Sequence, residues 1–196
     1  MTQALWVLCL LLLAAGYIAA PSGPVLAAGL GNRAMTCDAV GPASIDNLLV
    51  TRHMIRAMPR QFADFRPVAA VCPGVLARTG LEALELVRPA AVIAVDALAA
   101  RDSARLCATV QLSDTGLVPG SGVGNRRSAL DRGTLGVPVI AVAIPTGGDA
   151  DPRAGLFLTP RDIDQRIREL GRLLGYGITL ALQPSLTAAD VTALLG

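Results

Sequence analysis

The sequence contains no lysine, and all 17 of its basic residues are arginine. This absence excludes a Schiff-base lysine, a Ser-Lys dyad and the Walker phosphate loop, because each of them requires a lysine side chain. The arginines are also scattered: their longest run is the pair Arg126 and Arg127, and the formal net charge is only +2. Nucleic-acid binding usually requires a clustered basic face, so we expect no direct contact with nucleic acid.

Histidine and cysteine are scarce as well. The one histidine and the four isolated cysteines, with no C-x-x-C pair, are a poor ligand set for structural zinc, and we expect neither a metal nor a cofactor. A reduced cytoplasmic protein fits this cysteine usage. A thiol nucleophile, Cys37 or Cys72 paired with His53, stays open as an alternative to buried cysteines and a packed histidine.

The apolar stretch at residues 4–20 (ALWVLCLLLLAAGYIAA) carries no charge. Its length approaches the roughly 18 to 20 apolar residues of a membrane helix. A signal peptide, however, begins with a positive segment, and the first arginine is Arg33. The PSGP turn then leads directly into a strand-like run. We therefore predict a helix packed on a sheet, with a membrane anchor or signal as the alternative.

From Pro21 onward, short apolar runs alternate with amphipathic segments. The runs predicted as strands are PVLAAGL, RPVAAVCP, AAVIAVDA, ATVQLSD and VPVIAVAIP. Helices are predicted at residues 44–58, 79–87, about 100–106 and 128–135. Runs that are apolar on both faces suit a parallel sheet covered by helices, so the pattern predicts an α/β fold.

The sequence changes character after Pro145. The segment at 146–155 (TGGDADPRAG) is rich in Gly, Asp and Pro and is predicted as a loop. A long helix follows, with Thr159 as its cap and Pro160 at its first position. A short helix from Thr187 to Leu195 ends the chain.

Three glycine-containing motifs suggest functions that their context does not support. The G-L-G-N at 29–32 lacks the third glycine of a dinucleotide fingerprint and is predicted to be a tight turn after a strand. The D-T-G at 114–116 occurs once and within an α/β pattern, unlike the all-β pepsin-like proteases; we interpret Asp114 as a turn residue near the crevice. The glycine-rich loop at 117–127 is either a ligand-approaching loop or a long connection.

Asp38 and Asp96 are the strongest candidates for chemistry. Each follows an apolar run, in GLGNRAMTCDAVGP and AAVIAVDALAARD, and ligands of an open α/β sheet bind beyond the carboxyl ends of its strands. Two carboxyl groups that share a site can divide the roles of general acid and general base, and so hydrolyse an amide without a metal. Capping of a helix is the alternative role for both residues.

The ordered blocks of the chain from about Pro24 to Gln183 resemble the germination protease family of spore-forming bacteria. The matching blocks are GLGN, DAVGP with DNLLVTRHM, FRPVAAVCPGVLARTGLE, VIAVDALAARD, TVQLSDTGLVPGSGVGNRR, LGVPVIAVAIPT, GLFLTPRDID and GITLALQP. The resemblance implies a three-layer α/β/α sandwich with a mostly parallel central sheet, as in the hydrogenase-maturation proteases. It also implies an aspartate-dependent endopeptidase whose two functional aspartates correspond to Asp38 and Asp96.

The resemblance carries further expectations. The substrate would be the small acid-soluble spore proteins, the location the spore interior, and the assembly a homotetramer. Supporting site residues would be Asn32, His53, Arg101 and Asp114. We expect one peptidase domain over residues 1–196, with an apolar helix at 1–20, the sheet core at 21–146, and a loop with C-terminal helices at 147–196.

Two departures from the family pattern keep other functions open. Family members carry an N-terminal region with a propeptide, whereas this chain starts at the helix before the first strand and resembles an N-terminally short version. The family's T-P-D-A-L-G-P is also T-C-D-A-V-G-P here, so Cys37 replaces a proline beside Asp38. The alternatives are a hydrogenase-maturation-like protease and a non-catalytic truncated homologue.

Overall fold

The computed structural model describes residues 23–74, 79–120, 128–151 and 156–196. Within them, six strands form one sheet in the order β2-β1-β3-β5-β4, with β6 paired to β5. The strands are β1 (Val25–Leu30), β2 (Val68–Gly74), β3 (Ala91–Ala100), β4 (Gln111–Ser113), β5 (Val139–Asp151) and β6 (Leu156–Leu158). The first four in this order run parallel, and β4 and β6 run antiparallel to β5. The prediction of a mostly parallel sheet is confirmed.

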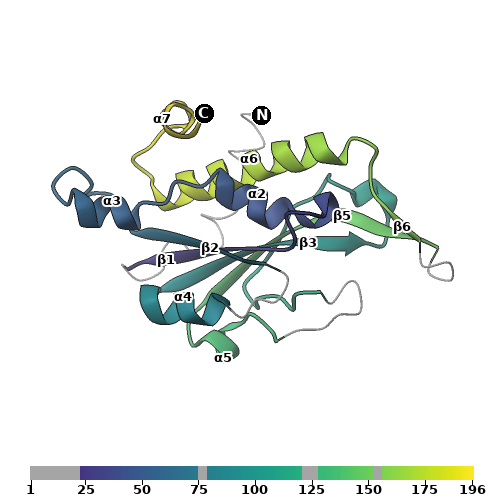
Figure 1. The fold of residues 1–196 in the computed structure, drawn as a ribbon, viewed down its shortest axis with the longest axis horizontal. Helices are drawn as coiled ribbons and strands as arrows, with labels where there is room; N and C mark the ends of the chain where they lie inside the picture. Colours follow the sequence, from purple (N-terminus) through teal and green to yellow (C-terminus); the bar gives the residue numbers. More distant parts are fainter. Residues whose placement is uncertain (1–22, 75–78, 121–127, 152–155) are drawn as a thin grey trace.

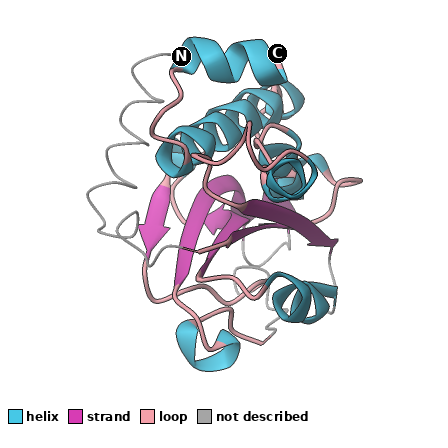
Figure 2. Cartoon of the chain, turned by 90° about the vertical axis from the view of Figure 1, so that its left-hand side faces the viewer, coloured by secondary structure: helices cyan, strands magenta, loops and turns pink. Residues whose placement is uncertain are grey.

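Helices cover both faces of the sheet, which gives three layers (Figures 1 and 2). The helices are α2 (Val40–Asp46), α3 (Arg52–Ala57), α4 (Thr79–Val87), α5 (Arg132–Leu135), α6 (Ile163–Leu182) and α7 (Ala188–Leu195). One apolar core joins the sheet to α2 and α6, and a second joins the other face to α4 and α5. All six residues of β1 are buried, as expected for a central strand whose side chains face both cores.

Helix α2 approaches the sheet unusually closely. A Cβ on Gly41 would lie 2.2 Å from the Leu30 carbonyl oxygen and 2.6 Å from that of Val95. Any larger residue would therefore push α2 away from β1 and β3. This contact fixes the start of α2 directly beyond the end of β1.

The predicted helix at 44–58 is wrong in its extent. The structure has two shorter helices, α2 and α3, separated by a turn. The reason is a tertiary contact: the Leu49 amide donates 3.0 Å to Thr179 Oγ1 on α6, so it is not available to a continuous helix. Thr51 then ties the chain to β2, because its hydroxyl oxygen accepts from the Val68 amide at 2.9 Å.

The C-terminal predictions are partly corrected. Strand β5 continues through residues 146–151, predicted as loop, because it pairs with β3 and then with β6. The long helix begins at Ile163 with Asp162 as N-cap rather than at Thr159. Thr187, by contrast, caps α7 through a capping box with Asp190, and that helix is confirmed.

Two further helix predictions fail in part. At 100–106 the structure has only the 3-10 turn η2 (Ser103–Arg105), since β3 extends to Ala100. The predicted helix at 128–135 is reduced to α5, which is capped by Asp131. Strand β4 is short and antiparallel, not part of the parallel set.

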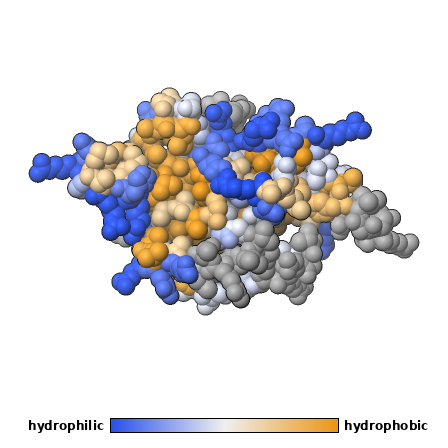
Figure 3. All heavy atoms as spheres, viewed as in Figure 1, coloured by the Kyte–Doolittle hydropathy of each residue, from blue (hydrophilic) through white to orange (hydrophobic). Residues whose placement is uncertain are grey.

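The surface drawn in Figure 3 has hydrophilic side chains over α3 and over the outer side of α6, with apolar side chains between them. The apolar segment at 4–20 and most of the glycine-rich loop, residues 121–127, lie outside the described residues. In the part of the chain that the structure describes, no helix is long and apolar enough to cross a membrane.

Candidate active site at the carboxyl end of the sheet

Asp96 lies where the sheet opens between two strands. Strand β1 pairs with β3 from Val25 to Gly29, whose partner is Val95, so Asp96 is the first residue of β3 beyond these pairs. On its other side β3 stays paired to β5 through Ala100, with Asp96 opposite Ala143. The expectation that Asp96 follows the end of its strand is therefore wrong: it is the sixth of ten strand residues, and β1 is the strand that ends beside it.

The Asp96 side chain is nearly enclosed. The residue is only 7% exposed, and its Oδ1 accepts from the Ala97 amide at 2.9 Å. Since Asp96 is inside a strand, a helix-capping role is excluded. A buried carboxylate in a gap between strands is costly unless its partners and function compensate for the lost hydration.

Asp38 ends the 3-10 turn η1 (Thr36–Asp38), which follows the end of β1. The Asn32 backbone amide donates 2.8 Å to Asp38 Oδ2 and 3.1 Å to the Asp38 carbonyl oxygen. The Asn32 side chain turns the other way and accepts from the Ala34 amide at 2.9 Å. Asn32 therefore contacts the Asp38 carboxyl through its backbone and not through its amide side chain.

The turn between β1 and Asp38 depends on Gly31. Its φ of +110° is in the region that disfavours side chains, and a Cβ there would lie 2.0 Å from the Asp38 carbonyl oxygen. The G-L-G-N motif is thus the tight turn predicted from the sequence, and its second glycine lets the chain fold back on Asp38. The contribution of Gly31 to the aspartate site itself was not predicted.

The turn η1 contacts β3, β5 and α6, so the segment that carries Asp38 lies over the strand that carries Asp96. The Thr146 hydroxyl of β5 donates to the carbonyl oxygen of Cys37, the residue before Asp38. On the next residues, Ala39 and Val40 pack into the core beneath α6. Asp38 therefore lies beyond the end of β1, and Asp96 lies on β3 beside that same end. We call this region, toward which the parallel strands β1, β2, β3 and β5 run, the carboxyl end of the sheet.

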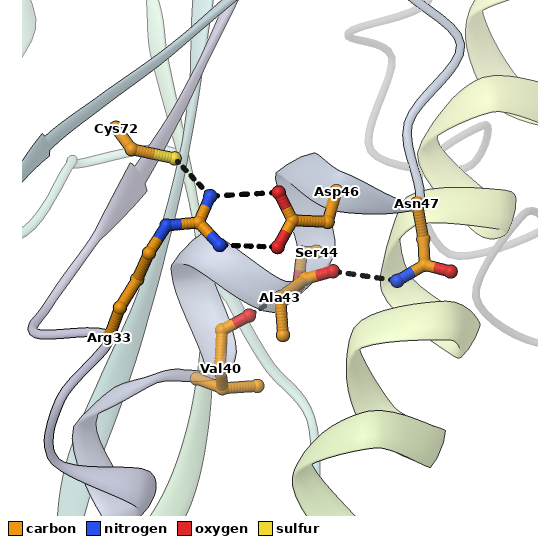
Figure 4. Close-up of polar contacts among 7 residues, drawn as sticks. All are labelled: Arg33, Val40, Ala43, Ser44, Asp46, Asn47 and Cys72. Atoms are coloured by element: carbon orange, nitrogen blue, oxygen red, sulfur yellow. Dashed lines mark hydrogen bonds and ion pairs between the residues drawn. The ribbon is translucent and has the colours of Figure 1, made fainter.

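Arg33 holds the loop between β1 and η1 against two other elements (Figure 4). Its guanidinium forms a two-point ion pair with Asp46 of α2, with Nη2 at 2.8 Å from Oδ1, and Nη2 also lies 3.6 Å from Cys72 Sγ of β2. The hydrogen bonds from Arg33 lower the pKa of Asp46. The sequence did not indicate this contact, because the partners are 13 and 39 residues from Arg33.

The thiols at this end of the sheet are poor nucleophiles. Burial raises the pKa of both Cys37 and Cys72, and the charge of Asp38 raises that of Cys37 further. A raised pKa leaves less of the reactive thiolate at neutral pH. His53 lies on α3 in a groove that also includes Ala69 and Ala70, near the start of β2. The alternative of a Cys-His pair is not supported.

The structure does not bring the other supporting candidates to Asp96. His53 is exposed, contrary to the expected packed histidine. Arg101 is exposed after the end of β3. Strand β4 is antiparallel to β5, and its first residue, Gln111, pairs with Ala143, which also pairs with Asp96. Asp114 follows the last residue of β4, Ser113, and is therefore not level with Asp96. Gln111 is level with Asp96 on the far side of β5, which was not predicted because the antiparallel direction of β4 is not evident from its sequence.

Among the residues that the structure describes, no three His, Cys, Asp or Glu side chains are grouped so that they could hold a metal ion. The structure places one carboxyl group on β3 and another on a turn that contacts β3, on the side of the sheet where α/β proteins bind their ligands.

Comparisons with known proteins bear on the family and the fold of this chain. The profile of the germination protease family matches residues 13–154. The germination protease of Priestia megaterium is 43% identical over 185 residues, which are 85% of this chain and 49% of that protein. The germination protease of Halalkalibacterium halodurans is 48% identical over 157 residues, 76% of this chain and 41% of that protein. The chain thus spans less than half the length of either relative.

A solved structure shares the fold. The NiFe hydrogenase maturation protease HycI from Thermococcus kodakarensis KOD1 aligns with a TM-score of 0.53 at 16% identity, covering 84% of this chain and 98% of that one. At this identity the likeness concerns the fold alone, and it confirms the α/β architecture. The profile match over most of the chain and the identities above 40% concern the family, and they show that this chain belongs to the germination protease family.

Proposed function

We propose that this chain is an endopeptidase that hydrolyses peptide bonds with Asp38 and Asp96 as its catalytic pair. The observation that carries the proposal is the position of both aspartates at the carboxyl end of the sheet, one on β3 and one on the turn that contacts β3. Membership of the germination protease family supports the reaction class.

The reaction needs no group beyond the two carboxyls and a water molecule. One carboxylate removes a proton from the water as it attacks the peptide carbonyl carbon, and the other, protonated, donates to the leaving nitrogen as the C–N bond breaks. Two carboxyls that share a site share one proton, because both cannot ionise close together without strong repulsion. This division requires the carboxyl groups to lie within roughly 8 Å of each other.

The residues around the pair have distinct roles in this proposal. The Asn32 amide holds the Asp38 carboxyl, and Gly31 allows the turn that brings that amide into place. The enclosed position of Asp96 limits its access to bulk water, which strengthens its interaction with a bound peptide. The family suggests small acid-soluble spore proteins as substrates, the spore interior as the location and a homotetramer as the assembly.

The test is cleavage of a purified acid-soluble spore protein, with the products mapped by mass spectrometry. Asp38→Asn and Asp96→Asn should each reduce kcat by about 10³-fold or more without unfolding the protein, because an amide cannot exchange the required proton. Asp64→Asn is the matched control, since Asp64 is an exposed loop residue. Activity that survives in either variant would refute the catalytic pair.

Inhibitors separate the proposal from other mechanisms. A metal chelator and a thiol-blocking reagent should both leave the activity unchanged. Loss on chelation would favour the hydrogenase-maturation-like protease, and loss on thiol modification would favour a cysteine nucleophile. A folded wild-type protein that cleaves no spore protein would favour a non-catalytic homologue.

A further inference from the structure

We propose that Thr146 of β5 is a positioning residue that fixes the orientation of Asp38. This inference rests on the proposed function, because it concerns how one member of the catalytic pair is aimed. Thr146 is 1% exposed, and its hydroxyl donates to the Cys37 carbonyl oxygen, which is 109 residues away in the sequence.

The position of Thr146 in the strand is unusual. Strand β5 pairs with β3 at Pro145 and Leu98 and then at Gly147 and Ala99, so Thr146 is an extra residue opposite no residue of β3. Such a bulge changes the direction of a side chain and is frequent beside active sites. Here the bulge places the hydroxyl against η1 rather than in the regular pattern of the strand.

The hydrogen bond from Thr146 acts on Asp38 through the planar peptide group that joins Cys37 to Asp38. The Cys37 carbonyl and the Asp38 amide belong to the same planar peptide group, so a constraint on the oxygen sets the plane that leads into Asp38. The other end of this group is also held, because the Asp38 amide donates 2.8 Å to the Met35 carbonyl oxygen. With both ends held, this peptide group has one orientation, and the Asn32 amide holds the Asp38 carboxyl.

Strand β5 thereby relates the two aspartates to each other. Ala143 of β5 is paired with Asp96, and Thr146, three residues later on the same strand, bonds the segment of Asp38. The spacing between the two carboxyl groups is consequently set by a rigid element of the sheet. Loss of the Thr146 hydroxyl would remove one of the contacts that orient the peptide group before Asp38, while leaving the pairing of Asp96 with Ala143 in place.

The experiment replaces the hydroxyl and follows kcat and KM separately. Thr146→Val, which keeps the branched shape, should lower kcat about 10- to 100-fold with KM within about threefold, since a small misplacement of a reacting group can cost that much. Thr146→Ser, which keeps the donor, should retain kcat within about fivefold. The pH profile of kcat should shift in Thr146→Val, because the shared proton depends on the spacing of the carboxyls.

Thr179→Val is the matched control. Thr179 is also 1% exposed, and its hydroxyl donates to the Gly175 carbonyl and accepts from the Leu49 amide, remote from Asp38. This variant should lose stability but keep the kcat and pH profile of the wild-type protein per folded molecule. If Thr146→Val does not fold, Thr146→Cys, whose thiol is a weaker donor, should still lower kcat relative to Thr146→Ser.

The outcomes distinguish this inference from the function on which it rests. An unchanged kcat in Thr146→Val, or an equal loss in Thr179→Val, would overturn the role of Thr146 while the loss of activity in Asp38→Asn upheld the catalytic pair. Full activity in Asp38→Asn would instead overturn the proposed function itself. A kcat loss in Thr146→Val that Thr146→Ser restores supports the positioning role.

Discussion

At the amino end of the sheet, where the parallel strands begin, Gln183, the C-cap of α6, binds both backbone groups of Arg66. Its Oε1 accepts from the Arg66 amide at 2.9 Å, and its Nε2 donates 2.8 Å to the Arg66 carbonyl oxygen. Gln183 is 1% exposed and Thr51, which also bonds the Arg66 carbonyl, is fully buried. These groups are uncharged, and each is paired inside the protein.

The carboxyl end of the sheet is built differently. There the polar groups include carboxylates, an arginine and thiols, and the ion pair of Arg33 and Asp46 is more than half exposed. The backbone takes up a left-handed conformation at Gly31 and a bulge at Thr146. Irregular backbone and incompletely buried charge concentrate at functional sites, where the rest of the structure must hold them in place.

We infer that buried hydrogen bonds serve stability at the amino end of the sheet and orientation at the carboxyl end. If this is correct, substitutions at the carboxyl end should reduce activity out of proportion to stability. Substitutions at the amino end should reduce stability and leave kcat unchanged. Three changes test the difference.

The largest combined effect is expected for Gly31→Ala at the carboxyl end. The added Cβ would meet the Asp38 carbonyl oxygen at 2.0 Å in a backbone with φ of +110°, so the turn must move and Asp38 with it. We expect a loss of about 2–4 kcal/mol in unfolding free energy and of at least about 10²-fold in kcat. Denaturant unfolding and peptide cleavage measure the two effects.

Gly136→Ala is the control for backbone strain alone. Gly136 has φ of +72°, but a Cβ there would have no atom within 4 Å. Gly136→Ala should lower the unfolding free energy by about 1–2 kcal/mol and leave kcat unchanged. Equal losses of kcat in the two variants would show that Gly31 does not act through Asp38.

The next effect in size is expected for Gln183→Leu at the amino end. The leucine fills the space but removes the two hydrogen bonds that the Gln183 side chain makes to the Arg66 amide and carbonyl, while the Thr51 hydroxyl still donates to that carbonyl. The loss should lower the unfolding free energy by about 1–3 kcal/mol. The kcat of the folded protein should not change. Gln165→Leu, on the exposed side of α6, should alter stability by less than about 0.5 kcal/mol. A reduced kcat in Gln183→Leu would mean that the two ends are coupled.

Sequence alone predicted the central part of the fold well. The strands β1 and β3 are continuous apolar runs, and such runs have few alternatives to a buried position in a parallel sheet. The continuation of β5 through Gly147 and Gly148 was not predictable in this way, because glycine disfavours strands and the pairing depends on Ala99 and Ala100, far away in the sequence. The break between α2 and α3 likewise depends on Thr179.

For the site, too, local sequence predicted some features, and contacts between distant residues determined the others. The nomination of Asp38 and Asp96 came from their positions after apolar runs and from the family resemblance, whereas the end of β1 beside Asp96 became visible only with the strand register. The contacts of Arg33 and Thr146 join residues distant in the sequence, and neither residue type is specific to a catalytic site. Local patterns identify the groups that can react, but tertiary contacts determine how they are held.

The smallest effect is expected for the exposed ion pair at the carboxyl end. Arg33 lowers the pKa of Asp46 in the folded protein, so the pair contributes stability above the unfolded aspartate pKa of about 3.9, and this contribution is lost as the pH falls through the lower folded value. Because both side chains are more than half exposed, solvent screens the pair, and Arg33→Gln should cost at most about 1 kcal/mol at pH 7. Urea unfolding measures the difference in unfolding free energy between the wild-type protein and Arg33→Gln. This difference should be constant above about pH 5, shrink below that pH, and decrease with added salt.

Arg168→Gln, which removes the same charge from the exposed face of α6, is the control, and its difference from the wild-type protein should not shrink at low pH. A large and pH-independent cost of Arg33→Gln would mean that Arg33 stabilises the loop through its contact with Cys72 and its packing rather than through its charge.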